Sequence, residues 1–432
     1  MTAPAAPAVT VSRLTVGWGD RDDPALLATH EARYGPLPSP EPAAGLIEAV
    51  TQAGLTGRGG AGFPTGTKMA AVAHGKGPAV VVANGMDSEP ASDKDEALLS
   101  RAPHLVLDGA ALAAASVGAS QVFICVPRFK NSLIGLVQRA VAERTRAGID
   151  PVAIAVHDPP GGYVSSSETA LVNWLNGNEA KPTATPPRPF QRGVDRRPTL
   201  ISNVETFAHI GLIARFGPEW FRQGGRPEAP GSMLVTVSGA VAAPGVFEVA
   251  GGTPVGAALD LAGPDERSGF VLIGGYFGSW NKIAQVGHLP LAQSTLRPVG
   301  ASPGAGVLVV LPHDSCGLTE TARLLAWFAE QSAGQCGPCR FGLPAIADDF
   351  ARLASGHPDG YLLDRLERRL GQVNGRGACA HPDGAVRLAS SALSAFAPDV
   401  RAHASSRPCL HAPPGSAPDP VLPIPAHAEA EA

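Results

Sequence analysis

The chain has 432 residues, enough for about two to four domains, and 44% of them are hydrophobic, so a substantial core can be buried. The net charge of −4 gives no reason to expect nucleic acid as a partner. No run reaches the roughly 20 apolar residues of a membrane span, and residues 1–13 lack the basic and apolar regions of a signal peptide. We therefore expect a cytoplasmic protein with no transmembrane segment of its own.

The first half of the chain alternates between helix and strand patterns. Residues 1–40 are rich in Pro and Ala and are predicted to be an irregular segment. In residues 41–228, apolar β-branched runs predict buried strands and Ala/Leu-rich or amphipathic runs predict helices, which is typical of an α/β layer sandwich. The predicted helices are residues 43–53, 103–118 and 130–147, and the predicted strands are residues 77–85, 121–127 and 151–158.

The second half changes character twice. Residues 229–300 read as strand, strand, helix and strand with Gly-Pro turns, which predicts a small compact α+β module. Residues 301–404 begin with a strand and continue as short helices, which is typical of a four-helix bundle. The tail, residues 405–432, is rich in Pro, Ala and His and is predicted to be disordered. The predicted strand is residues 306–312, and the predicted helices are residues 318–332, 342–354, 360–371 and 383–396.

A glycine-rich loop, residues 57–66, satisfies the pattern G-x-G-x-x-G. A dinucleotide-binding loop of that pattern follows a strand, whereas this one follows a helix, so the Rossmann interpretation fails. Two interpretations remain open. The loop is a flexible turn without a ligand, or its glycines let backbone N–H groups approach a phosphate or a flavin edge, with Arg58 and Lys68 supplying charge.

Polar residues follow the first predicted strand, in the run Asn84-Gly85-Met86-Asp87-Ser88-Glu89-Pro90 and then Asp93-Lys94-Asp95. Ligands of α/β proteins bind at the carboxyl ends of the strands, so this position favours a binding site. An exposed acidic turn is the alternative.

The six cysteines of a chain without a secretion signal indicate metal or redox chemistry rather than a disulfide framework. Cys336 and Cys339 have the C-x-x-C spacing, which lets two thiolates reach one metal centre, and Cys379 follows a glycine-rich turn. An iron–sulfur cluster, a zinc ion and a thioredoxin-type dithiol are the three interpretations. Cys125 lies inside a predicted strand and is expected to be an inert core residue.

Taken together, the motifs resemble the family of flavin- and iron–sulfur-carrying F subunits of respiratory complex I, with the related hydrogenase and formate dehydrogenase subunits. The family motifs occur in order as GLTGRGGAGFPTGTK, NGMDSEPASDKD, YVSSSETAL, PTLISNVET, VSGAVAAPGVFEV, SAGQCGPCR and GACAHPDG. The resemblance implies an α/β FMN-binding layer sandwich, a ubiquitin-like β-grasp (SLBB) module and a C-terminal iron–sulfur helical bundle.

The resemblance also implies roles for individual residues. Phe63 would stack on the adenine of NADH, and Glu89 and Glu168 would be the catalytic carboxylates at the nicotinamide. The cluster ligands would be Cys336, Cys339 and Cys379. The other expected cofactor-binding residues, around the flavin, are Gly57, Arg58, Gly59, Gly60, Lys68, Asn84, Asp87, Tyr163 and Asn203.

The sequence departs from the family at both cofactors. Ala333 stands where the family has the first cysteine of its cluster motif, so the fourth ligand would be Cys316, His381 or a non-protein group. A helix of about 15 residues would separate Cys316 from Cys336 by some 20 Å. Ser167 replaces one carboxylate of the nicotinamide site, and a second adenine-stacking aromatic residue is absent near Ala71.

The expected function is to pass electrons from NADH through FMN to a [4Fe–4S] cluster and on to a partner. One alternative is a flavin and iron–sulfur subunit that uses a ferredoxin-like or membrane redox partner without NADH. The other is a scaffold subunit that has lost a cofactor. The expected partners are other subunits of an electron-transfer complex, with the chain peripheral at the inner face of a membrane.

Overall fold

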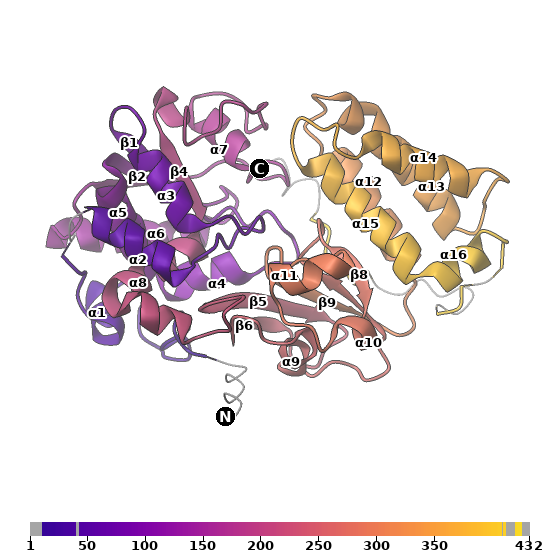
Figure 1. Cartoon of the computed structure of the whole chain (residues 1–432), viewed down its shortest axis with the longest axis horizontal. Helices are drawn as coiled ribbons and strands as arrows, with labels where there is room; N and C mark the ends of the chain where they lie inside the picture. Colours follow the sequence, from indigo (N-terminus) through magenta and orange to yellow (C-terminus); the bar gives the residue numbers. More distant parts are fainter. Residues whose placement is uncertain (1–10, 40–42, 408, 412–419, 426–432) are drawn as a thin grey trace.

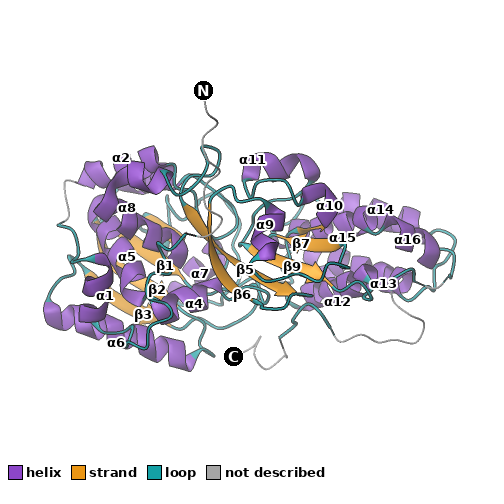
Figure 2. Cartoon of the chain, turned by 90° about the horizontal axis from the view of Figure 1, so that it is seen from below, coloured by secondary structure: helices purple, strands orange, loops and turns teal. Residues whose placement is uncertain are grey.

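The computed structural model describes residues 11–39, 43–407, 409–411 and 420–425. Three parts follow one another along the chain: an α/β part (residues 43–222), a mixed-sheet part (residues 232–311) and a helical part (residues 317–403). Figure 1 shows the mixed-sheet part below and between the other two, and Figure 2 shows the same parts turned by 90°. The predicted three-part α/β architecture is confirmed. Within the described residues, no helix has both the length and the apolar character needed to cross a bilayer.

The α/β part is built on a parallel four-stranded sheet of order β3-β2-β1-β4. Alternate residues of β1 face opposite layers, so Val81 packs under helices α5 and α8 while Val80 and Val82 face α7. The strands are β1 (Ala79–Asn84), β2 (Ala119–Cys125), β3 (Ala153–His157) and β4 (Thr199–Asn203). The helices of this part are α2 (Ala43–Ala53), α3 (Thr65–Ala73), α4 (Lys94–Arg101), α5 (Pro103–Val117), α6 (Asn131–Ala147), α7 (Glu168–Leu175) and α8 (Val204–Arg222).

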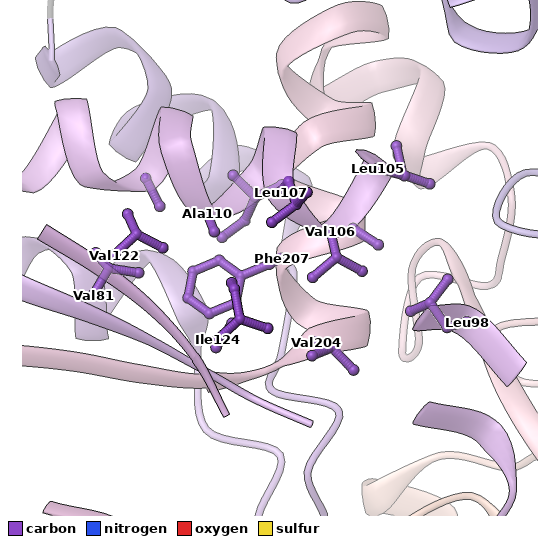
Figure 3. Close-up of a cluster of buried hydrophobic side chains, with 14 of the residues drawn as sticks. Val81, Leu98, Leu105, Val106, Leu107, Ala110, Val122, Ile124, Val204 and Phe207 are labelled. Carbon is purple, nitrogen blue, oxygen red and sulfur yellow. The ribbon is translucent and has the colours of Figure 1, made fainter. Parts of the chain in front are cut away.

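The larger core of this part lies between the sheet and the pair α5 and α8. Figure 3 shows Phe207 of α8 against Val81, Val122 and Ile124 of the strands. The two helices approach closely because Gly109 faces α8, where an added Cβ would lie 1.7 Å from the Phe207 carbonyl oxygen. This contact holds β4 and the start of α8 in place at the end of the sheet.

The mixed-sheet part has five strands in the order β6-β5-β9-β7-β8. Its central pair, β5 and β9, is parallel, and the flanking pairs are antiparallel. The strands are β5 (Ser232–Gly239), β6 (Gly245–Ala250), β7 (Phe270–Ile273), β8 (Ser279–Lys282) and β9 (Val307–Leu311), and the helices are α9 (Val255–Asp260), α10 (Ile283–Val286) and α11 (Gln293–Leu296). The strand expected at the start of the helical bundle is β9, and its hydrogen bonds instead make it the central strand of this sheet.

The helical part contains the four predicted helices and one more short helix. They pack around fully buried apolar side chains such as Phe328, Phe350 and Leu366. Residues Pro338–Gly342 form a π-helical turn that precedes α13. The helices are α12 (Gly317–Glu330), α13 (Leu343–Ala354), α14 (Leu362–Val373), α15 (His381–Ala395) and α16 (Ala397–His403).

Both predictions for the chain ends are partly wrong. Residues 27–34, expected to be irregular, form α1 (Leu27–Tyr34), and the backbone N–H groups of Leu14 and Thr15 donate to the Glu248 carboxylate. In the tail expected to be disordered, Leu422 is fully buried and its N–H donates to Glu320 at 3.2 Å. Both segments are ordered because they bury apolar side chains and satisfy backbone groups. Within the expected irregular segment and tail, residues 1–10, 40, 408, 412–419 and 426–432 lie outside the described residues.

Candidate cofactor sites

The glycine loop connects α2 to α3 and closes on itself. The Gly57 N–H donates to the Phe63 carbonyl at 2.9 Å, and Thr56 pairs with Pro64. Gly60 has φ +107° and Gly62 has φ +63°, which side chains with a Cβ rarely adopt. Phe63 is 54% exposed at the end of the loop, so its ring face is available for stacking.

Arg58 is turned inward from this loop. Its backbone N–H donates to Thr206 Oγ1 at 3.0 Å and its guanidinium donates to the Ser232 carbonyl at 2.9 Å. The guanidinium also lies 3.8 Å from Glu205. Burial lowers the pKa of Arg58, while Glu205 opposes that change. The Arg58 guanidinium was expected to face a ligand, but it links the α/β part to β5 instead.

The carboxyl ends of β1 and β4 bring two expected site residues together. Asn84 and Asn203 are register partners on neighbouring strands. Asn84 Nδ2 donates to the Ser166 carbonyl at 2.8 Å, and Asn203 Nδ2 donates to the Asp95 carboxylate at 2.5 Å. The glycine loop reaches the same edge, since a Cβ on Gly59 would lie 3.4 Å from that of Asn203. Both asparagines therefore order the loops that surround this edge.

A buried charge cluster lies beneath this edge. The Lys94 ammonium group contacts Asp95 at 2.6 Å and Glu205 at 3.1 Å. Burial opposes ionisation of Glu205, yet Lys94, His209 and Arg58 together lower its pKa to about 2. Asp87 behaves oppositely, because burial and then the Asp95 charge raise its pKa to about 8. The cluster therefore combines carboxylates that favour different protonation states.

Lys68 and Glu168 meet across the site. The Lys68 ammonium group forms an ion pair with the Glu168 carboxylate and donates to the Ile201 carbonyl at 2.6 Å. Glu168 is the first residue of α7, and Ser167 is its N-cap. The serine that replaces the family's carboxylate thus caps a helix, since its hydroxyl accepts from the Ala170 N–H.

Glu89 lies where the α/β part meets the mixed-sheet part. One carboxylate oxygen accepts from the Tyr276 N–H at 2.8 Å and from the Tyr163 hydroxyl at 3.1 Å. The other oxygen is buried and has no hydrogen-bond partner among the described residues. Burial raises the pKa of Glu89 to about 7, although the Tyr276 N–H, the Tyr163 hydroxyl and the Ala91 N–H oppose that rise. An unpartnered carboxylate oxygen of this kind fits a site that is completed by a ligand.

Two residues that hold Glu89 were missed in the sequence. A Cβ on Gly275, which has φ +86°, would lie 2.5 Å from the Glu89 carboxylate, so only glycine fits there. Tyr276 follows it and supplies the N–H. The only sequence signal for these two residues is the pair of glycines after β7. That pair does not indicate that Tyr276 contacts Glu89, which lies 187 residues away in the chain.

Tyr163 connects this site to the helical part. Its ring centroid lies 4.8 Å from that of Phe277, 5.0 Å from that of Trp327 and 5.9 Å from that of His381. Its backbone N–H donates to the Gln331 side chain at 3.1 Å. One residue of the α/β part therefore contacts both of the other parts.

Cys336, Cys339 and Cys379 interact beyond the end of α12. Burial opposes thiolate formation at Cys336, but the backbone N–H groups of Ala378 and Cys339 lower its pKa. At Cys339, burial and then the neighbouring Cys336 and Cys379 thiols raise the pKa to about 12. These three thiols fit a shared metal centre, because thiolates are its ligands.

The spacing of these thiols separates a cluster from a single ion. In the described part of the chain, one group of three ligand-type side chains has all its donor atoms within 4.8 Å of one another, and it does not contain Cys336, Cys339 or Cys379. Sulfur ligands of one zinc ion lie about 3.8 Å apart, given a Zn–S bond of about 2.3 Å and tetrahedral geometry. Each thiolate of a cubane cluster binds a different iron atom, so its thiolates are further apart. The three thiols therefore do not already hold the geometry of a single zinc ion.

Two protein side chains, Cys316 and His381, were expected as candidates for the fourth cluster ligand, and neither is clearly placed for that role. Cys316 is the N-cap of α12, at the opposite end of a 14-residue helix that is about 20 Å long. It lies with His403 and Cys409 instead. His381 uses Nε2 to contact the Phe328 carbonyl at 2.8 Å, which leaves only Nδ1 for a ligand role.

Three family models match the chain. The Nuo51 FMN-binding domain matches residues 50–212, the SLBB domain matches residues 234–263, and the iron–sulfur binding region of NADH-ubiquinone oxidoreductase-F matches residues 319–403.

Similar proteins include the F subunit of the Streptomyces coelicolor NADH-quinone oxidoreductase, which is 32% identical over 380 residues covering 84% of each chain. The F 2 subunit of the Rhizobium meliloti enzyme is 31% identical over 384 residues, covering 84% of this chain and 90% of its own. Among solved structures, a chain of an NAD⁺-reducing [NiFe]-hydrogenase in the air-oxidized state has a TM-score of 0.81 and 27% identity, covering 96% of this chain and 70% of its own.

Proposed function

Because the chain belongs to the family of NADH-quinone oxidoreductase F subunits, we propose that it takes electrons from NADH through FMN into a [4Fe–4S] cluster. The electrons then pass to another subunit of a larger complex, in which this chain is peripheral at the inner face of a membrane. Bound FMN supplies hydride acceptance and single-electron release, and the cluster supplies a one-electron carrier.

The single observation that carries this proposal is Glu89. Its carboxylate accepts from Tyr163, an expected flavin-site residue, and from Tyr276 of the mixed-sheet part, and its other oxygen is buried without a partner. Glu89 would bind and orient the nicotinamide, while Phe63 would stack on the adenine. A buried carboxylate of this kind is costly unless a ligand supplies its last hydrogen bond.

Other residues would hold the flavin. The glycine loop offers backbone N–H groups at Gly59 and Gly60, where no side chain projects, while Gly57 shapes the loop by donating its N–H to the Phe63 carbonyl. Lys68 would leave its ion pair with Glu168 and contact the flavin instead. Asn84, Asp87, Tyr163 and Asn203 would line the strand ends, with Arg58 fixing the loop from within.

Cys336, Cys339 and Cys379 would hold the cluster. The N–H groups of Ala378 and Cys339 already favour the Cys336 thiolate. With Ala333 at the usual first position, the fourth ligand would be His381 Nδ1 or a non-protein group.

A second function is favoured by the helix cap at Ser167, which leaves the nicotinamide site with one carboxylate fewer than the family has. It is electron transfer between the same two cofactors and a ferredoxin-like or membrane redox partner, without NADH.

Anaerobic titration of the purified, cofactor-loaded protein with NADH separates the two functions. Bleaching of the flavin absorbance by stoichiometric NADH is expected. Bleaching by reduced ferredoxin with none by NADH would support the second function, with dithionite as the control that the flavin can be reduced. Protein without flavin or iron would contradict both functions.

A further inference from the structure

A second group of ligand-type side chains lies away from the cofactor sites, where α12 begins and α16 ends. Cys316 is the N-cap of α12, His403 is the last residue of α16, and Cys409 follows in the next segment. Their ligand atoms all lie within 4.8 Å of one another, and Cys316 Sγ is 4.0 Å from His403 Nε2. We propose that Cys316, His403 and Cys409 bind a zinc ion, separate from the iron–sulfur cluster.

The orientation of His403 is the first argument for this site. Its Nδ1 lies 2.9 Å from the Ala354 carbonyl and 3.1 Å from the Leu353 carbonyl, so Nδ1 carries the proton. The lone pair therefore lies on Nε2, the nitrogen that faces Cys316. Metal-binding histidines are arranged in this way, because a donor bond from one nitrogen fixes the ring for the other.

The spacing is the second argument. Tetrahedral zinc with bonds of about 2.3 Å to sulfur and about 2.0 Å to nitrogen holds those ligand atoms about 3.5 to 3.8 Å apart. Donor atoms within 4.8 Å need only small side-chain movements to reach that geometry. Two thiolates and one imidazole also form the ligand set that zinc prefers. Binding would displace the protons of both thiols.

The position of Cys409 is the third argument. Buried Asp399 holds the segment, accepting from the Leu410 N–H at 3.1 Å and contacting His411 Nδ1 at 2.9 Å. Without metal, the Cys409 thiol donates to the same carboxylate at 3.6 Å. Zinc binding removes that proton, so Asp399 would then position Cys409 through the Leu410 N–H rather than through the sulfur.

The fourth coordination position would be taken by water. A cavity of about 90 Å³ lies beside residues that neighbour Cys316 and Cys409 in the chain, and its lining includes Ser315, Phe396 and His411. The zinc would tie the junction of β9 and α12 to the end of α16, which are far apart in the chain. Its role would be to stabilise the helical part, because a metal that binds only the folded chain adds its binding free energy to folding.

Metal analysis of the full chain with flavin and iron bound tests the site. After dialysis against EDTA, the unaltered protein should retain about one zinc ion per chain, the stoichiometry of a single site. Cys409→Ser and His403→Gln should lose the zinc and keep flavin and iron. Cys379→Ser should do the reverse, losing iron and keeping zinc, and Cys125→Ala should keep both metals. The zinc result stands whether or not the cluster proposal is correct, because the two metals are measured separately.

Cobalt provides a readout that does not depend on whether a variant folds. Co²⁺ added to the zinc-free protein should produce thiolate-to-cobalt charge-transfer absorption that Zn²⁺ abolishes. Three results would overturn the proposal: iron-replete protein without zinc, zinc that survives in Cys409→Ser, or a Cys316–Cys409 disulfide in protein purified without reductant.

Discussion

At the scale of single residues, Glu89 combines burial, two hydrogen-bond donors and one unpartnered oxygen. Its raised pKa, about 7, places its ionisation in the physiological range. A carboxylate accepts a stronger hydrogen bond than a carboxylic acid does. The ionised form would therefore bind the nicotinamide amide better.

Replacing this carboxylate tests that role. Glu89→Gln keeps an acceptor for Tyr163 and Tyr276 but removes the charge, so kcat/KM for NADH should fall roughly 10- to 100-fold, the value of a hydrogen bond to a charged group. In the unaltered protein, kcat/KM should rise as the pH passes upward through about 7, because a raised pKa keeps the carboxyl protonated below that value. Steady-state kinetics from pH 6 to 8 (about one unit either side) measure both effects.

The matched control is the exposed Glu179, whose change to Gln should alter neither kinetics nor flavin content. An unchanged pH profile in Glu89→Gln would assign the titration to another group, such as Asp87.

The sequence predicts most residues of this site, but it does not predict the residues of the mixed-sheet part that contact Glu89. The glycine loop, the strand-end asparagines and Glu89 all lie in local motifs, so the family resemblance finds them. Gly275 and Tyr276 come from a different part of the chain and meet Glu89 only through tertiary packing. The Arg58 side chain also could not be oriented from sequence, because its partner Ser232 lies 174 residues away.

At the scale of elements, the close approach of α5 and α8 sets the position of β4 and Asn203. Gly109→Ala would force a Cβ to within 1.7 Å of the Phe207 carbonyl oxygen, so the helices must separate. The expected loss of unfolding free energy is about 1–3 kcal/mol, as for other overpacked cores. Urea denaturation followed by circular dichroism measures it.

A second glycine provides the control. Gly135 lies inside α6 with no atom within 4 Å of an added Cβ, so Gly135→Ala should stabilise the protein by about 0.5–1 kcal/mol. Equal effects of the two substitutions would show that helix propensity, not packing, governs Gly109.

Element types were predictable, whereas the sheet to which β9 belongs was not. Periodicity and β-branched content identify a strand at residues 306–312, and β9 is there. Its partners β5 and β7 depend on chain topology, which no local pattern encodes.

At the scale of the whole molecule, residues 420–425 connect the mixed-sheet part and the helical part. The Tyr276 hydroxyl donates to the Pro423 carbonyl at 2.5 Å, and Arg323 of α12 donates to the Leu422 carbonyl at 2.8 Å. A composition rich in Pro, Ala and His predicted disorder for this tail, but one fully buried leucine and satisfied backbone groups order these residues.

Removing that leucine should loosen the connection. Leu422→Ala deletes a fully buried side chain, for which a cost of about 2–5 kcal/mol is typical. Hydrogen exchange should therefore increase in residues 420–425 and around Tyr276, with β1 and β2 unaffected. Leu26→Ala, at a 45% exposed position, should leave exchange in these segments unchanged. Faster exchange throughout the chain in Leu422→Ala would mean that the tail supports global rather than local stability.

The central position of β9 also has a consequence for how the chain folds during synthesis. Until residue 311 has left the ribosome, β5 and β7 lack the strand that lies between them, and each exposes an unpaired edge. The β5–β6 hairpin must therefore wait for about 60 further residues, which at roughly 5–20 residues per second takes several seconds. A fragment that stops at residue 300 would keep those edges permanently and would be prone to aggregate, whereas one that extends through Leu311 can complete the sheet.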